Sequence, residues 1–63
     1  MTHAEIKRRI DHIADVARRG YIILTEAERE MMKVLHDASL DPNTPSLYSD
    51  YHYAFVQLAK LTR

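Results

Sequence analysis

The chain has 63 residues, nine basic and nine acidic side chains, and no cysteine. A domain of this size buries only roughly 60% of the surface that its unfolded chain exposes, so its stability is marginal without further support. In the absence of cysteine, neither a disulfide nor a thiolate zinc site can supply that support, and association with another chain is the expected source. The balanced charge gives no net field that attracts nucleic acid or anionic lipid.

The longest uninterrupted apolar run covers residues 21–24, far short of the roughly 18 residues that a membrane-spanning helix needs. The first ten residues have the pattern of an amphipathic helix and contain no apolar core of a signal peptide. We therefore expect a cytoplasmic protein that has no membrane partner. The cysteine-free composition agrees with a reducing compartment.

A first helix is predicted over residues 3–19. Its apolar side chains fall on one helical stripe, namely Ile6, Ile10, Ile13, Ala14 and Ala17. The segment from Thr2 to Glu5 has the spacing of a capping box, which marks a helix start. Gly20 is suited to the left-handed residue that commonly ends a helix.

A second helix is predicted over residues 26–38, with a second capping box from Thr25 to Glu28. Its inner face is expected to consist of Ala27, Met31, Val34, Leu35 and Ala38. Met32 points well away from that stripe. Residues 20–24 are too short for a helix and read as an extended link pressed into the core; a strand that pairs with a second copy is the alternative.

A third helix is predicted over residues 46–62, after a turn-forming segment that contains Pro42. Thr44 and Pro45 resemble a cap followed by proline at the first helical position, and Ser49 or Asp50 offers a later start. One broad side is expected to face the other helices, namely Leu47, Tyr48, Tyr51, Ala54, Phe55, Leu58, Ala59 and Leu61. Tyr53 and Val56 are expected on the opposite side. The predicted fold is a single all-α domain over residues 1–63, a compact three-helix bundle with the short extended link at 20–24.

No catalytic or metal-binding signature is present in these residues. The four histidines include no pair four residues apart on a helix, which a zinc-binding helix of the metalloprotease type requires. The serines lie in or beside the proline-containing loop, and a single glycine excludes the glycine-rich phosphate loops. We expect a protein that is not an enzyme and that uses neither a cofactor nor a metal.

A basic cluster on the first helix raises the alternative of a DNA-associated regulator. Its members are Lys7, Arg8, Arg9, Arg18 and Arg19, and lysine and arginine contacts to phosphate supply most non-specific affinity for DNA. Glu5 and Asp15 lie three or four residues before several of these cations, a spacing at which salt bridges form along the helix. The cations are therefore expected to have local partners.

Residues 24–35, which begin Leu-Thr-Glu-Ala-Glu-Arg-Glu, resemble the opening of the helix-turn-helix domains of LuxR-type regulators and of sigma-factor region 4. That resemblance implies a tight turn and then a recognition helix rich in basic and polar side chains. This chain departs from that pattern, because a loop with two prolines and a tyrosine-rich helix follow instead.

The positive signal for a partner is apolar surface outside the predicted stripes. The partner-binding candidates are Met32, Tyr48, Tyr53 and Val56, and tyrosine and methionine are enriched in protein interfaces. We expect a small regulatory or accessory protein of the inhibitor or adaptor type. It is expected to be a homo-oligomer and to bind another protein through its third helix and the outer face of its second. Phage-borne factors are often of this size. A small anionic ligand held between protomers is a second alternative.

Overall fold

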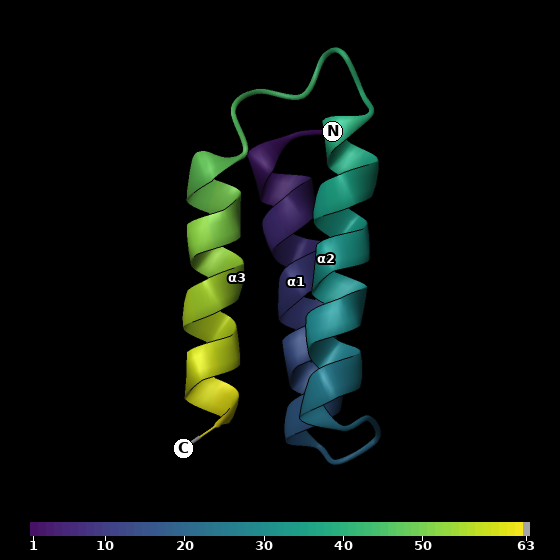
Figure 1. Ribbon diagram of the computed structural model, residues 1–63, viewed down its shortest axis with the longest axis vertical. Helices are drawn as coiled ribbons and strands as arrows, with labels where there is room; N and C mark the ends of the chain where they lie inside the picture. The colour runs from purple at the N-terminus through teal and green to yellow at the C-terminus, as the bar shows by residue number, and fades with distance from the viewer. Residues whose placement is uncertain (63) are drawn as a thin grey trace.

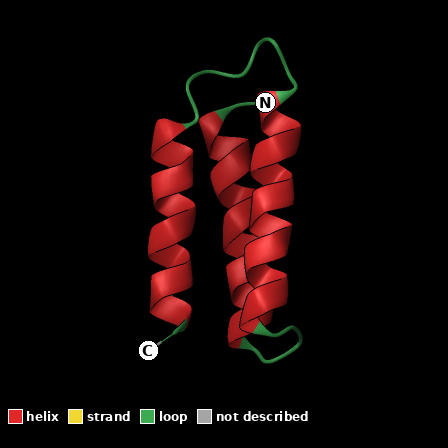
Figure 2. Ribbon diagram, in the orientation of Figure 1, coloured by secondary structure: helices red, strands yellow, loops and turns green. Residues whose placement is uncertain are grey.

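The computed structural model describes residues 1–62. It contains three helices, α1 (His3–Arg18), α2 (Leu24–Ser39) and α3 (Tyr48–Leu61). They form a bundle of 34 × 17 × 16 Å in which α1 and α3 run in the same direction and α2 runs opposite to both (Figure 1). The described chain consists of helices and loops (Figure 2), so the predicted all-α three-helix bundle is confirmed.

Helix α1 begins and ends as its sequence predicts. The Thr2 hydroxyl accepts a hydrogen bond from the Glu5 backbone N–H at 3.2 Å, which satisfies one of the free donors of the first turn. At the other end, Gly20 has a φ of 86°, a left-handed conformation that glycine adopts without a steric penalty. The N–H groups of Gly20 and Tyr21 bond to the carbonyls of Ala17 and Val16, the pattern of a Schellman motif.

Helix α2 begins earlier than predicted. Its N-cap is Ile23, which provides no side-chain hydrogen bond, and Thr25 lies inside the first turn. The second capping box is therefore wrong, although three glutamates near this end still suit the helix dipole. The link between α1 and α2 is present, but Tyr21 and Ile23 are exposed and only Ile22 is half-buried. The expectation that the link packs into the core is wrong, and residues 21–24 form no strand in the described chain.

The connection from α2 to α3 is a turn organised by Asp41. The Asp41 side chain accepts a hydrogen bond from the Asn43 N–H at 2.9 Å, and its carbonyl accepts one from the Thr44 N–H at 3.0 Å. Such side-chain bonding to the backbone two residues later is typical of aspartate in turns. Helix α3 then begins at Tyr48 with Leu47 as N-cap and no side-chain cap, so the predicted cap at Thr44 is wrong.

The core is built mainly by α1 and α2. The buried apolar residues are Ile6, Ile10, Ala14, Ala27, Met31, Leu35, Ala38 and Ala54. Seven of these eight belong to α1 and α2, and they match the predicted inner faces of both helices. Helix α1 contacts both of its neighbours extensively, whereas α2 and α3 contact each other less. The bundle is consequently more open between α2 and α3 than on its other sides.

Within residues 1–62, no helix combines the length and the apolar composition that a membrane crossing demands.

Candidate interaction surface

The contact between α1 and α3 contains a hydrogen bond between a buried carboxyl group and a histidine. Asp50, in the first turn of α3, is fully buried, and its Oδ2 lies 2.6 Å from Nδ1 of His3 at the start of α1. The other carboxylate oxygen, Oδ1, has no hydrogen-bond partner among the described residues. A buried carboxylate is costly unless it is paired. The bond to His3 therefore favours the rotation of α3 that turns Asp50 towards α1.

A second polar contact joins the same two helices further along. The Tyr53 hydroxyl of α3 donates a hydrogen bond to the Asp11 carboxylate of α1, and Lys7 Nζ lies 5.3 Å from the centroid of the Tyr53 ring. The bond to Asp11 requires the protonated phenol, so it raises the pKa of Tyr53 above its ordinary value of 10.0, and burial acts in the same direction. We call these two contacts the α1/α3 polar seam: His3 with Asp50, and Asp11 with Tyr53.

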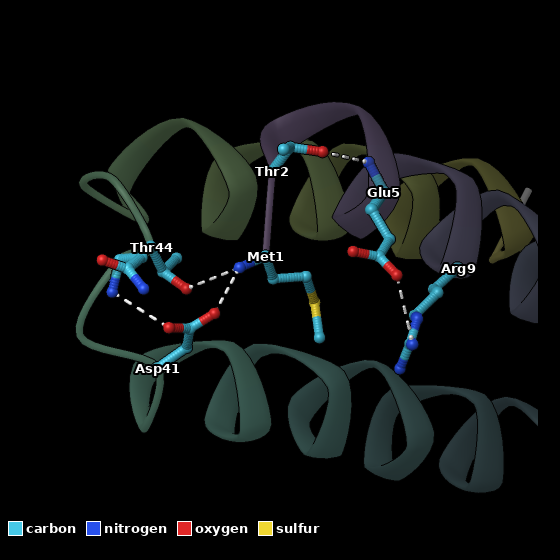
Figure 3. A network of polar contacts seen from close by, with 7 residues as sticks. Met1, Thr2, Glu5, Arg9, Asp41 and Thr44 are labelled. Carbon is cyan, nitrogen blue, oxygen red and sulfur yellow. Dashed lines mark hydrogen bonds and ion pairs between the residues drawn. The ribbon is translucent and has the colours of Figure 1, made fainter.

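The start of α1 is tied to the loop that leads into α3. The Met1 amino group forms an ion pair with the Asp41 carboxylate and lies 3.3 Å from Thr44 Oγ1. In Figure 3 this amino group points into the loop while the Met1 side chain extends between the helices. The hydrogen bond from the Met1 amino group lowers the pKa of Asp41 below its ordinary value of 3.8, and the hydrogen bond from the Asn43 N–H lowers it further by a smaller amount.

The basic residues of the DNA-binding alternative largely have partners within the chain. Arg9 pairs with Glu5 at 3.4 Å, as Figure 3 also shows, and Arg18 and Arg19 pair with the same Asp15 carboxylate at 3.8 and 3.1 Å. The predicted local pairing is therefore confirmed for these three arginines. Lys7 lies over the Tyr53 ring, and Arg8 is exposed. These basic residues and the acidic residues that pair with them thus form a helix surface that carries charges of both signs.

An apolar groove runs between α2 and α3. It has a volume of about 360 Å³ and is lined by Leu24, Glu28, Met32, Phe55, Leu58, Ala59 and Thr62. The α2 members are four residues apart, so they stand on one side of that helix. Phe55 is 76% exposed and Met32 is 40% exposed, which is unusual for large apolar side chains that lie together.

The groove continues along α3 into a shallower depression of about 210 Å³. Its lining consists of Tyr48, Tyr51, His52 and Phe55. Phe55 belongs to both hollows, so they form one surface along the length of α3. We call this surface the α2/α3 groove. It presents three aromatic rings and the apolar side chains of Leu24 and Met32.

The structure brings together some of the predicted partner-binding residues and separates others. Met32 and Tyr48 lie on the α2/α3 groove, linked through Phe55. Tyr53 does not lie there, and the expectation that it faces outwards is wrong, because it is half-buried against α1. Val56 is partly exposed, but it does not line the groove.

The error at Tyr53 has a physical cause. Apolar side chains surround α3 on most sides, so the sequence pattern favoured the side that contains Tyr51 and Phe55. In the structure, burial of Asp50 sets a different rotation of α3. Tyr53 then faces α1, and Phe55, about 200 degrees further around the helix axis, faces the α2/α3 groove.

Sequence reasoning also missed Leu24 and Phe55 as surface residues. The spacing of Tyr48, Tyr51, Phe55, Leu58 and Thr62 contained the signal, since these positions alternate three and four residues apart.

A third hollow bears on the prediction of an anionic ligand. It lies at the end of the bundle where α1 ends and α2 begins, has a volume of about 390 Å³, and is lined by Ala17, Arg18, Leu24, Lys60 and Leu61. Two cations therefore border it, although Arg18 is also paired with Asp15. This hollow is formed within one chain, whereas the predicted site for an anionic ligand lies between protomers.

Within residues 1–62 there is no group of three or more histidine, aspartate or glutamate side chains placed to hold a metal ion. The chain matches no protein-family model, no curated protein and no solved structure at a significant level.

Proposed function

We propose that this protein is a non-enzymatic interaction module of the accessory or regulatory type, an inhibitor or adaptor, that binds a helical segment of another polypeptide in the α2/α3 groove. The observation that carries the proposal is the continuous apolar surface on which Leu24, Met32 and Phe55 meet. Contiguous exposed apolar surface on a small folded domain is characteristic of a binding site.

A helix is the occupant that this geometry favours. The groove lies between two helices, and its lining residues recur every three to four positions on both, as they do where a further helix packs against a helical pair. Amphipathic helices commonly bind in such grooves through apolar anchors at helical spacing. The aromatic rings of Tyr48, Tyr51 and Phe55 add large contact area at little cost in side-chain entropy. We place the protein in the cytoplasm, because a cysteine-free chain has no need of an oxidising compartment.

Site-specific photo-crosslinking tests this proposal. A photoreactive phenylalanine analogue would replace Phe55 in the full chain, and the same analogue would replace Lys33, an exposed residue of α2 outside the groove lining, in a matched control. After irradiation in the producing cells, we expect polypeptide adducts from position 55 and few from position 33. Equal yields from both positions, or no adduct from position 55, would contradict a binding role for the groove.

A further inference from the structure

Helix α3 and its two cap residues carry two lines of side chains at the spacing of a coiled-coil heptad. The inner line is buried or half-buried and consists of Leu47, Asp50, Ala54, Gln57 and Leu61. The outer line consists of Tyr48, Tyr51, Phe55, Leu58 and Thr62, and all five of these residues line the α2/α3 groove. The inner line faces the chain's own helices, whereas the outer line is exposed except at Leu58, which is half-buried against the core.

The inner line buries no large apolar side chain completely, since Leu47 and Leu61 pack only partly against the core. The fully buried residues of α3 are Asp50 and Ala54, while Phe55 and Tyr48 are 76% and 86% exposed. Burial of apolar area is the main force that holds a helix in a bundle, and a domain of this size has little to spare. Helix α3 would therefore gain substantially from a partner that covers its outer line.

We propose that the occupant of the α2/α3 groove is α3 of a second copy of this chain, packed antiparallel to the first across a two-fold axis at Phe55. The inference rests on the proposed function, because it names the partner of the same groove. The resulting dimer would have α2 and α3 of both copies around one shared apolar core.

The exposed area is sufficient for such a dimer. At roughly 200 Å² for each fully buried aromatic side chain, the exposed fractions of Tyr48, Tyr51 and Phe55 amount to about 400 Å². Leu24 and Met32, each about 40% exposed, raise this area to roughly 500 Å². Two symmetric copies would bury about 1,000 Å², which is the lower limit for a specific interface.

The outer line is complementary to itself in the antiparallel orientation. With the two-fold axis at Phe55, a residue that precedes Phe55 in one copy faces the residue that follows Phe55 by the same number of positions in the other copy. Tyr51 faces Ala59 of the second copy, a groove residue beside the outer line, and Tyr48 faces Thr62. Leu58 faces His52, which also lines the groove. Large side chains opposite small ones interdigitate well. Phe55 meets its own copy on the axis, where two aromatic rings pack favourably.

A parallel pair would be poorly packed by comparison. Each tyrosine would face the same tyrosine of the second copy, and Ala59 would face Ala59 across a gap. Charge also permits self-association, since the outer line has no carboxylate, ammonium or guanidinium group and the nine basic and nine acidic residues of the chain cancel. Glu28 and His52 are the polar residues of opposite type that border the groove.

The mass of the full chain in solution tests the dimer. Light scattering after size-exclusion chromatography is expected to give twice the 7.4 kDa of one chain. Phe55→Glu places two carboxylates against each other on the axis and should give a monomer that retains its helical circular dichroism. Leu40→Glu is the matched control, because Leu40 is 69% exposed but lies outside the groove lining, and this variant should remain dimeric.

Disulfide formation tests the orientation and remains informative if Phe55→Glu fails to fold. The chain has no cysteine, so introduced residues are the only thiols. In an antiparallel pair, Tyr51→Cys with Ala59→Cys in the same chain should form covalent dimers on mild oxidation, because the two positions face each other across the interface. Ala59→Cys alone should not, since its two copies are about 12 Å apart along the axis, beyond the roughly 7 Å that a disulfide spans between Cα atoms.

Three results would overturn this inference: a monomeric wild-type chain, a dimer that Phe55→Glu leaves intact, or efficient crosslinking of Ala59→Cys alone. They can be separated from failure of the proposed function. A monomeric chain whose position 55 still crosslinks to a different polypeptide would retain the groove as a binding site and exclude the second copy as its occupant. A monomeric chain without adducts would end both proposals.

Discussion

The two sides of α3 differ in what they bury. Towards α1, the polar seam joins His3 to Asp50 and Asp11 to Tyr53. Towards α2, the groove leaves Phe55 and its apolar neighbours open to solvent. The helix has thus turned a carboxylate inwards and an aromatic ring outwards, against the ordinary preference of both residue types.

This difference shows what decides the rotation of a helix that is apolar on most sides. The hydrophobic effect is non-directional, so several rotations of α3 would bury similar area. A hydrogen bond is directional, and the pairs His3 with Asp50 and Asp11 with Tyr53 are both made in the same rotation. The polar seam therefore fixes the orientation, and the apolar surface that remains becomes available for binding.

The core beneath both sides of α3 gives the largest expected effect. Ile10→Ala removes a fully buried side chain of α1 and should cost about 2–5 kcal/mol of unfolding free energy. At 0.05–0.15 kcal/mol per residue, this chain has only about 3–9 kcal/mol in total, so the variant should lose a large fraction of its stability. Urea denaturation followed by circular dichroism measures the change.

Ile23→Ala is the matched control for that substitution, because Ile23 is 67% exposed in the link. A change within about 0.5 kcal/mol is expected there. Equal losses in the two variants would mean that the link is buried and that Ile10 does not belong to the core.

Breaking the polar seam at His3 gives an intermediate effect. His3→Ala leaves the buried Asp50 carboxylate without its partner and should cost about 1–3 kcal/mol. Adding Asp50→Leu should restore part of that loss, since an apolar side chain replaces the unpaired carboxyl group. Urea denaturation of the two single variants and the double variant gives the coupling energy.

His12→Ala serves as the control on the same helix, at an exposed position, and should change stability little. If His3→Ala were equally harmless, the orientation of α3 would not depend on the polar seam.

The smallest expected effect is at Tyr53. Tyr53→Phe removes the hydrogen bond to Asp11 and should cost about 1 kcal/mol near neutral pH. Because the folded-state pKa of Tyr53 is raised above 10.0, the stabilisation by this bond is fully present below the pKa of the unfolded state. It is lost as the pH rises through the folded-state value.

Phenolate absorbance during an alkaline titration checks the Tyr53 prediction. The wild-type chain should show one tyrosine that ionises above the ordinary value, and Tyr53→Phe should lack that late component. A late component that persists in the variant would assign the raised pKa to another tyrosine.

The sequence predicted α1 and α2 better than α3. Isoleucine and alanine at helical spacing in α1, and Met31, Leu35 and Ala38 in α2, define one stripe on each helix, and the structure buries those stripes. The cap at Thr2 and the left-handed Gly20 were also predicted, because both depend on local backbone geometry. The cap at Thr25 was not formed, since α2 extends to Leu24 and includes this residue in its first turn.

The sequence by itself determined the number of helices, the inner faces of α1 and α2, and the turn that contains Pro42. These features follow from the periodicity and backbone preferences of residues close together in the chain. Only the tertiary structure decided which side of α3 is buried. That outcome depends on partners 47 and 42 positions away, His3 for Asp50 and Asp11 for Tyr53. Periodicity within α3 carries no information about those partners, and the same rotation places Phe55 on the α2/α3 groove.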